Sequence, residues 1–413
     1  MDVLGDIRRS FVSSIPVSWG FCSASLARSA TNFTSTDSGW TTSAKLRNVL
    51  ISYVARELNT TYKTAANDPT VLFPSSSAVD AAIKQGFTQL DSDIVHSSVD
   101  KVLKSNTRRA AAELLAPALS GSCALLSFYD SQSKNLKVAC AGDSRAVLGR
   151  RSPNGKWMAL PLSEDQTGGT PAESKRLQAE HPGEPYVVRN GRILGQLEPS
   201  RSFGDAFYKW GRETQDKIKR QFFGRTPHPL LQSPPYVTAE PVITTTKIDP
   251  TKGDFLVLAT DGLWEMLDNE EVVGLVGQWI EKQRSEKTSS GTPWLSSWFG
   301  FGENKNLPVE GAQEAISEGQ RRPIRQQQYD ISGAASRFVV EDNNAATHLV
   351  RNAMGGKDKD MVCALLTLPS PYSRRYRDDV TVEVIFFGEG PDSRTISVNT
   401  EASASEEKQK AKL

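Results

Sequence analysis

Apolar residues recur every three or four positions along several stretches of the chain, which is the spacing of a helix with one buried face. The clearest stretch is 43–58 (SAKLRNVLISYVAREL), where the apolar side chains fall on a single face. Pro117 and Gly121 follow another such stretch and are expected to end it. The further helices predicted in this way cover residues 78–104, 107–115, 175–180, 269–282 and 344–354.

Short β-type runs are interleaved with these helices. The first two, 123–129 and 136–142, are joined by a polar link in hairpin fashion, and 145–150 follows closely, so consecutive hairpins and an antiparallel sheet are expected. The run 254–260 is apolar throughout and so covered on both faces, whereas 379–387 alternates. No period of 20 to 50 residues repeats, which argues against solenoids and propellers. Strand blocks interleaved with helix blocks favour the α+β class, with helices packed on antiparallel sheets.

Composition changes at both ends of the chain and once inside it. Between residues 7 and 36 there is no Asp, Glu or Lys, but there are arginines and many serines. That composition is typical of an organelle transit peptide, although Asp2 and Asp6 argue against one, and a disordered tail is the alternative. Residues 37–388 are expected to form one domain, with a long flexible surface insertion at 285–337 that carries the aromatic run WLSSWFGFG. Residues 389–413 are too polar to form a core and are expected to be a disordered tail.

The overall balance is that of a globular protein in water, with 38% hydrophobic and 23% charged residues. A net charge of only +1 gives no reason to expect nucleic acid as a partner. No apolar run approaches the ~18 residues of a membrane span, so no transmembrane segment is expected. The four cysteines show no metal-binding spacing, and we interpret them as reduced thiols of an intracellular protein.

Three aspartates stand at the ends of predicted strands. Asp143 lies in the turn of AGDSRAVL, Asp261 follows the apolar strand in LATDGLW, and Asp378 precedes the last strand in YRDDVTV. An ionised carboxylate at the mouth of a buried strand is costly unless a cation or several donors compensate it. A shared metal site explains all three more simply than three separate ion pairs. The alternative for each alone is a turn residue, or for Asp378 a surface ion pair with the arginines beside it.

The segments around these aspartates resemble the metal-dependent type 2C (PPM-type) serine/threonine protein phosphatases. The resemblance covers about residues 40–387, and the order of several motifs makes it specific. The segments 200–210, 234–241 and 341–353, together with the insertion, are most similar to the mitochondrial pyruvate dehydrogenase phosphatase branch and its fungal relatives. The motifs are GSCALLSFYDSQSKNLKVACAGDSRAVL, RILGQLEPSRSFGDAFYKW, LVLATDGLWEML and YRDDVTVEVIFF.

This resemblance implies a four-layer α-β-β-α sandwich of two antiparallel sheets flanked by helices. It further implies two Mg²⁺ or Mn²⁺ ions and a third, weaker metal position, and a metal-activated water that attacks the phosphorus directly. Asp261 and Asp378 match metal ligands of the family, and Asp143 with Asp261 matches the third position. Gly204 and Asp205 match a turn with a structural role.

The branch also implies a partner and a location. The partner would be a phosphoprotein substrate, with the pyruvate dehydrogenase complex as the candidate. The location would be the mitochondrial matrix, with the cytoplasm as the alternative.

The chain departs from the family in its N-terminal part. The aspartate that bridges both metals belongs to an Asp-Gly-His motif in the family, and its histidine is the general acid, but here residues 36–40 read Thr-Asp-Ser-Gly-Trp. Asp37 takes the place of the bridging ligand, although taken alone it reads as a helix N-cap. The four histidines lie elsewhere and are expected to be surface or packing residues. We therefore assign no catalytic side chain and no other cofactor-binding residue, and expect the first strands to be missing.

Three hypotheses follow from this departure. In the first, the sequence is a truncated or wrongly assembled version of an active phosphatase. In the second, it is a pseudophosphatase, that is, a non-catalytic module that binds phosphoproteins. In the third, it is a non-enzymatic interaction domain whose aspartates are turn residues. We favour the first, because the three downstream aspartates are intact.

Overall fold

The computed structural model describes residues 22–27, 39–70, 73–105, 107–289, 307–310, 320–328, 335–369 and 372–388. The chain divides into two compact units, and each unit has its own core. Unit 1 comprises Met1–Ala146, Leu162–Lys247 and Ser317–Gln320. Unit 2 comprises Val147–Pro161, Ile248–Ile316 and Arg321–Leu413.

Unit 1 is built on an antiparallel sheet with the strand order β1-β2-β3-β9, and β8 pairs with the first two residues of β2. The predicted hairpin is present, with Ala124 of β2 opposite Ala141 of β3. These strands are β1 (Cys22–Ala27), β2 (Gly121–Asp130), β3 (Asn135–Ala141), β8 (Phe203–Gly204) and β9 (Val242–Lys247).

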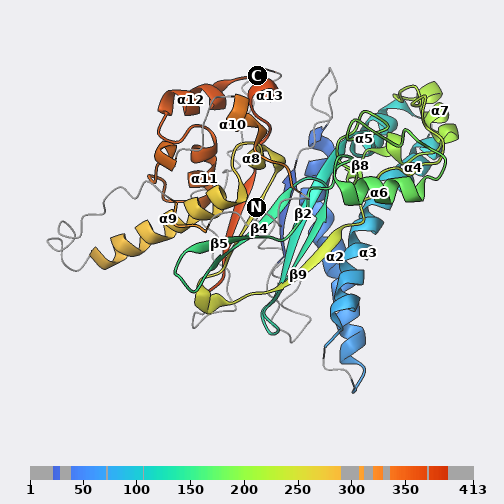
Figure 1. Cartoon of the computed structure of the whole chain (residues 1–413). Helices are drawn as coiled ribbons and strands as arrows, with labels where there is room; N and C mark the ends of the chain where they lie inside the picture. The colour runs from blue at the N-terminus through green and yellow to red at the C-terminus, as the bar shows by residue number, and fades with distance from the viewer. Residues whose placement is uncertain are drawn as a thin grey trace, which may run out of the picture. The chain divides into compact units, whose positions relative to one another are not determined.

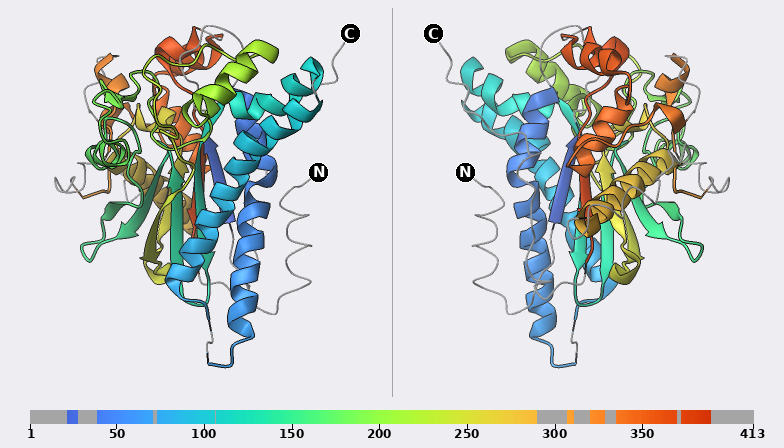
Figure 2. Two further views of the ribbon diagram at one scale, coloured as in Figure 1. Left: turned by 90° about the vertical axis from the view of Figure 1, so that its right-hand side faces the viewer. Right: turned by 90° about the vertical axis from the view of Figure 1, so that its left-hand side faces the viewer.

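Helices cover this sheet in unit 1, and α2 and α3 run side by side along it (Figure 2). Their apolar faces are buried in one cluster with residues of the sheet, for example Leu50 of α2, Ile83 of α3 and Leu126 of β2. A π-helical segment, Asp93–Ser97, joins α3 to α4 without a break. The helices of this unit are α2 (Gly39–Ala66), α3 (Ser76–Ser92), α4 (Ser98–Ser105), α5 (Arg108–Leu119), α6 (Pro171–Glu180) and α7 (Arg212–Gln221).

Unit 2 is built on a four-stranded sheet with the order β11-β10-β4-β5. β10 is buried at all five positions, as its continuous apolar run predicts. Helices α9 and α11 lie over this sheet (Figure 1), and Trp157 packs against Phe255 in its core at 5.0 Å between ring centroids. The strands are β4 (Arg145–Arg151), β5 (Trp157–Pro161), β10 (Phe255–Ala259) and β11 (Val382–Phe386). The helices are α8 (Asp261–Trp264), α9 (Asn269–Ser289), α10 (Ile324–Gln328), α11 (Ala345–Ala353), α12 (Lys359–Thr367) and α13 (Ser373–Tyr376).

The α+β class is confirmed, and each predicted helix and strand is present, most of them with shifted ends. Two details of the prediction are wrong. Helix α5 continues through Pro117 to Leu119, and the carbonyl groups of Ala116 and Pro117 accept hydrogen bonds from the hydroxyl groups of Thr41 and Thr42. The runs 136–142 and 145–150 do not form a hairpin, because β3 and β4 belong to different sheets. The short link between β3 and β4 therefore does not make them hydrogen-bonded neighbours.

The N-terminal segment and the insertion also differ from the prediction where the structure describes them. Residues 22–27, expected to lie in a tail, form β1 and pair antiparallel with β2, with Cys22 opposite Phe128. In the predicted insertion, α9 continues to Ser289, and residues 307–310 bond to Trp157 through main-chain groups. The run WLSSWFGFG and the predicted tail 389–413 lie outside the described residues. Among the helices that are described, none is long and apolar enough to span a bilayer.

Candidate metal centre

Three carboxylates of unit 2 converge at one end of its sheet. One ligand oxygen of each of Asp261, Glu265 and Asp378 lies within 4.8 Å of the others. Glu265 is buried, with 8% of its surface exposed, and the two aspartates are half-buried. Three acidic groups so close together repel each other, so the arrangement needs positive charge nearby.

Strand β10 and helix α8 position two of these carboxylates. Asp261 begins α8 and is separated from the buried strand by Thr260 alone, and Glu265 stands one helical turn later. The main-chain N–H of Glu265 donates to the carbonyl oxygen of Asp261 at 2.8 Å. Residues four apart on a helix share a face, so both side chains point to the same side.

Asp378 reaches the cluster because the chain that enters β11 lies against the start of α8. The Thr260 hydroxyl donates to the carbonyl oxygen of Asp379 at 2.7 Å and accepts the N–H of Thr381 at 3.0 Å. Gly262 makes this approach possible, since a Cβ atom there would lie 2.5 Å from the carbonyl oxygen of Asp379. Two strand ends more than 100 residues apart in sequence are thereby held side by side.

Two arginines supply positive charge to the cluster. The Arg325 guanidinium donates to Glu265 at 3.0 Å, and the Arg374 guanidinium donates to Asp378 at 3.2 Å. Arg325 comes from α10 and Arg374 from α13, so both elements are tied to the centre. The Arg325 side chain also donates to the carbonyl oxygen of Arg375 at 2.9 Å, which joins α10 to α13.

The donor set fits a hard divalent cation. Carboxylate oxygens are the protein ligands that Mg²⁺ and Mn²⁺ prefer. Two oxygens bound to one Mg²⁺ at about 2.1 Å are at most about 4.2 Å apart. A small side-chain rotation, or a water in one coordination position, would therefore bring the three carboxylates to one ion.

The structure brings together two of the four aspartates predicted as ligands, Asp261 and Asp378. Asp143 lies in unit 1, is buried, and accepts a hydrogen bond from the Cys123 thiol at 3.1 Å. Asp37 lies outside the described residues. Sequence reasoning missed Glu265, although its place four residues after Asp261 is the spacing of one helix face.

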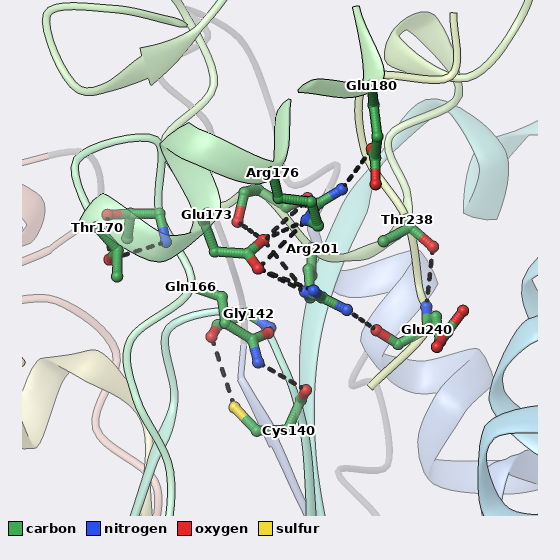
Figure 3. A network of polar contacts seen from close by, with 12 residues as sticks. Cys140, Gly142, Gln166, Thr170, Glu173, Arg176, Glu180, Arg201, Thr238 and Glu240 are labelled. Carbon is green, nitrogen blue, oxygen red and sulfur yellow. Dashed lines mark hydrogen bonds and ion pairs between the residues drawn. The ribbon is translucent and has the colours of Figure 1, made fainter. Parts of the chain in front are cut away.

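The turn that holds Asp143 is fixed from within unit 1 by Gln166 (Figure 3). The N–H of Gly142 donates to the side-chain oxygen of Gln166 at 2.8 Å, and the amide nitrogen of Gln166 donates to the carbonyl oxygen of Cys140 at 3.1 Å. Both groups that Gln166 contacts flank the end of β3. The position of the Asp143 backbone is thus set by buried hydrogen bonds.

A second polar network in unit 1 centres on Glu173 (Figure 3). Burial alone would raise the pKa of this carboxyl group, but hydrogen bonds from Arg201 and Arg176 outweigh it and lower the pKa to about 2. Arg201 also donates to the carbonyl oxygen of Glu240 at 2.7 Å. The Glu173 carboxylate therefore stays ionised and hydrogen-bonded at neutral pH. The network holds the SRSFGD segment in place and does not supply a general acid or base.

The Gly204–Asp205 turn has the structural role expected of it. The N–H of Gly204 donates to Asp91 at 2.9 Å, and Lys209 donates to the other oxygen of the same carboxylate at 2.6 Å. Asp205 has a left-handed backbone, with φ of 46°, and its N–H donates to the carbonyl oxygen of Ser120 at 2.9 Å. These bonds join the turn to α3 and α5.

The four histidines are packing or surface residues, as expected. His348 and His181 are buried, His228 is partly buried and His96 is exposed. Within the described part of the chain, the carboxylate cluster contains no histidine. The side chains of the cluster therefore offer oxygen donors.

Comparison with known proteins identifies the same family. The family model described as protein phosphatase 2C matches residues 29–292. A protein phosphatase 2C homologue of Schizosaccharomyces pombe is 45% identical over 353 residues, which are 85% of this chain and 72% of the relative. The mitochondrial pyruvate dehydrogenase (acetyl-transferring) phosphatase 1 of Saccharomyces cerevisiae is 43% identical over 378 residues, which are 88% of this chain and 62% of the relative. The human mitochondrial phosphatase 2 of the same description is 35% identical over 75% of this chain and 55% of its own length.

Proposed function

The chain belongs to the protein phosphatase 2C family of metal-dependent protein serine/threonine phosphatases, and we propose that it hydrolyses phosphoserine and phosphothreonine in proteins. The observation that carries the proposal is the carboxylate cluster, because two aspartates from separate family motifs meet there. We propose Asp261 and Asp378 as ligands of Mg²⁺ or Mn²⁺, with Glu265 as a third carboxylate of the same centre. Asp143 is proposed for the additional metal position.

When bound, such an ion lowers the pKa of a coordinated water and so supplies a nucleophile near neutral pH. The residues of the chain would hold the ion in place. The ends of β10 and β11 place Asp261 and Asp378, and the ion pair with Arg325 fixes the Glu265 carboxylate. The hydrogen bonds of Thr260 keep the two strand ends in register, so the oxygens stay directed at one point.

We further propose that this chain is a slow enzyme. Asp37, proposed at the place of the bridging ligand, is followed by Ser38-Gly39 and not by Gly-His. A missing general acid typically costs ~10²–10⁴-fold in rate. A pseudophosphatase that binds phosphoproteins without hydrolysing them is the second candidate, and the same departure favours it.

The substrate and the location are proposed from the relatives. Two of the three relatives above carry pyruvate dehydrogenase phosphatase and mitochondrial in their names. The chain spans 62% and 55% of the length of these two relatives. We propose the pyruvate dehydrogenase complex as the phosphoprotein partner and the mitochondrial matrix as the location.

The function is tested with the full chain and a phosphoserine peptide in Mn²⁺. We expect the wild type to release phosphate slowly. In D261N and D378N the rate is expected to be at least about 100-fold lower, because each variant removes a ligand charge. The control is D360N, since Asp360 is an acidic residue in the first turn of α12, outside the cluster. Mn²⁺-dependent peptide binding without hydrolysis would favour the pseudophosphatase, and neither binding nor hydrolysis would contradict both candidates.

The substrate is tested separately. Purified phosphorylated pyruvate dehydrogenase and an unrelated phosphoprotein are offered at equal concentration. Faster release from pyruvate dehydrogenase supports the proposed partner. Equal rates contradict it and leave the phosphatase assignment intact.

A further inference from the structure

The two arginines at the carboxylate cluster are held in different ways. The Arg325 side chain is 15% exposed and pairs with Glu265, and its main-chain N–H also donates to the carbonyl oxygen of Glu265 at 2.9 Å. Its guanidinium further donates to the side chain of Gln328 at 2.6 Å and to the carbonyl oxygen of Arg375. Arg325 is thus fixed by several partners and belongs to the framework of the centre.

Arg374 is held far more loosely. Its side chain is 40% exposed, and its contacts with Asp378 are long, at 3.2 and 3.4 Å from one nitrogen to the two carboxylate oxygens. The two residues are four apart in sequence, at the end of the short helix α13. A pair of this kind contributes only about 0–1 kcal/mol, so it can be exchanged for another partner at little cost.

The chemistry of the group indicates what that partner is. A guanidinium presents a planar fork of N–H donors that matches the oxygens of a phosphate group, and it keeps its charge at all physiological pH values. Arg374 already stands at hydrogen-bonding distance from a carboxylate that we propose as a metal ligand. A phosphate bound at that metal centre would lie beside it.

We propose that Arg374 is the phosphate-binding residue of this centre, and that it pairs with Asp378 until a substrate phosphate takes over the guanidinium. This inference rests on the proposed phosphatase function. It makes Arg374 a competitor of the metal ion for Asp378 before the substrate binds, and a partner of the substrate afterwards. Arg325, by contrast, keeps its contacts throughout.

Arg375 provides a matched control. It is the next residue on α13, it is also exposed, and its replacement removes the same charge from the same region. The pair R374Q and R375Q therefore separates the specific contact with Asp378 from the general effect of a positive charge near the centre.

The first measurement is Mn²⁺ binding to the full chain by calorimetry, without phosphate. R374Q is expected to bind Mn²⁺ about two- to fivefold more tightly than the wild type, because a surface ion pair no longer competes. R375Q should stay closer to the wild type. Equal affinities of R374Q and R375Q would overturn the competition between Arg374 and the ion.

The second measurement is the binding of inorganic phosphate to the Mn²⁺-loaded proteins. R374Q is expected to weaken this binding about 10- to 100-fold, the usual effect of losing a charged hydrogen bond. R374K should restore part of it, because an ammonium keeps the charge but lacks the planar fork. Phosphate affinity that is the same in R374Q and R375Q would overturn the inference.

Failure of the inference and failure of the proposed function give different results. If Mn²⁺ binds normally and R374Q behaves like R375Q, the inference is wrong and the metal centre stands. If no variant binds Mn²⁺ at millimolar concentration, the proposed function loses its centre, and the inference is overturned with it. Circular dichroism of each variant confirms that the compared proteins are folded.

Discussion

His348 shows how the packing of unit 2 holds one side chain in a single protonation state. Its ring is fully buried in α11, with Nε2 3.2 Å from the carbonyl oxygen of Leu275 and Nδ1 3.1 Å from the side-chain amide of Asn352. These partners suit a neutral ring that donates from Nε2 and accepts at Nδ1. Burial lowers the pKa of His348 to about 4, and the charge of Asp342 only partly opposes this.

This low pKa predicts a loss of stability in acid. Below about pH 6.5 the unfolded chain takes up a proton at His348, but the folded chain does so only near pH 4, so the stabilisation is complete above 6.5 and is lost as the pH falls towards 4. The difference between the two pKa values corresponds to roughly 3 kcal/mol of unfolding free energy. Urea denaturation at several pH values measures it.

The comparison variant is H348Q, which is less stable at neutral pH but should lose less unfolding free energy between pH 6.5 and 4. H96Q is the control, because His96 is exposed. If wild type and H348Q show the same pH dependence, the interpretation of His348 is wrong.

At the carboxylate cluster, the sequence was sufficient to select two of the three carboxylates, but it did not indicate Glu265 or Arg325. Asp261 and Asp378 could be predicted because each stands at a strand end, where a buried charge needs an explanation. Glu265 lies within the run LWEML, which reads as an ordinary helical stretch. Arg325 lies in the segment predicted to be an insertion, and no local pattern links it to Glu265 across 60 residues.

Among the elements, the two long helices of unit 1 approach closely where α3 carries a glycine. A Cβ atom at Gly86 would lie 2.7 Å from Cα of Val54 in α2. Such a distance is far below a normal contact, and both atoms belong to the rigid part of a helix. Gly86 therefore sets the distance between α2 and α3.

The substitution G86A is expected to destabilise the protein by about 1–3 kcal/mol through overpacking. The higher helix propensity of alanine offsets ~1 kcal/mol of this loss. G388A is the control, since nothing lies within 4 Å of a Cβ atom at that position, and it should change stability by less than about 0.5 kcal/mol. Denaturant midpoints measure both. A neutral G86A would mean that the helices can move apart without cost.

Gly262 has a comparable role for the metal centre. In G262A the new methyl group would push the start of α8 away from the carbonyl oxygen of Asp379, and so separate Asp261 from Asp378. We expect Mn²⁺ affinity to fall about 10- to 100-fold, as for other changes behind a ligand. The control G388A has open space around its Cβ atom. Equal Mn²⁺ affinity of G262A and wild type in calorimetry would contradict this account.

Individual elements were predictable, but their assignment to sheets was not. The runs that became β2, β3, β4, β10 and β11 have the β-branched and apolar composition of strands. A short turn suggests a hairpin, yet the turn at Asp143 connects strands of two different sheets. Sheet membership depends on which faces are buried after folding, and local patterns do not contain that information.

At the scale of the whole chain, two compact units with separate cores contain three of the predicted ligands, Asp143 in unit 1 and Asp261 and Asp378 in unit 2. The sequence predicted a single domain from 37 to 388 and did not indicate this division. The reason is that both units are discontinuous in sequence: residues 147–161 leave unit 1 to complete the sheet of unit 2. Discontinuous units have no composition boundary that a reading along the chain could detect.

Metal binding should be visible in the stability of the whole chain. An ion that binds the folded cluster but not the unfolded chain adds about 2.7 kcal/mol of stability when its concentration is 100 times Kd. We expect saturating Mn²⁺ to raise Tm by about 5 °C over EDTA in scanning calorimetry. All three carboxylates belong to unit 2. If the two units melt in separate transitions, Mn²⁺ should therefore raise the Tm of the unit 2 transition and leave that of unit 1 unchanged.

The variants D261N and D378N decide whether the shift arises at the cluster. Each removes one of the three charges that attract the ion, so the Mn²⁺-dependent rise in Tm should be largely lost, whereas D360N should keep it. In EDTA the two cluster variants should melt no lower than about 2 °C below wild type, because each relieves the repulsion among three carboxylates, which in D378N also offsets the broken ion pair with Arg374. A full Mn²⁺ shift in both D261N and D378N would place the bound ion elsewhere in the protein and would contradict the proposed centre.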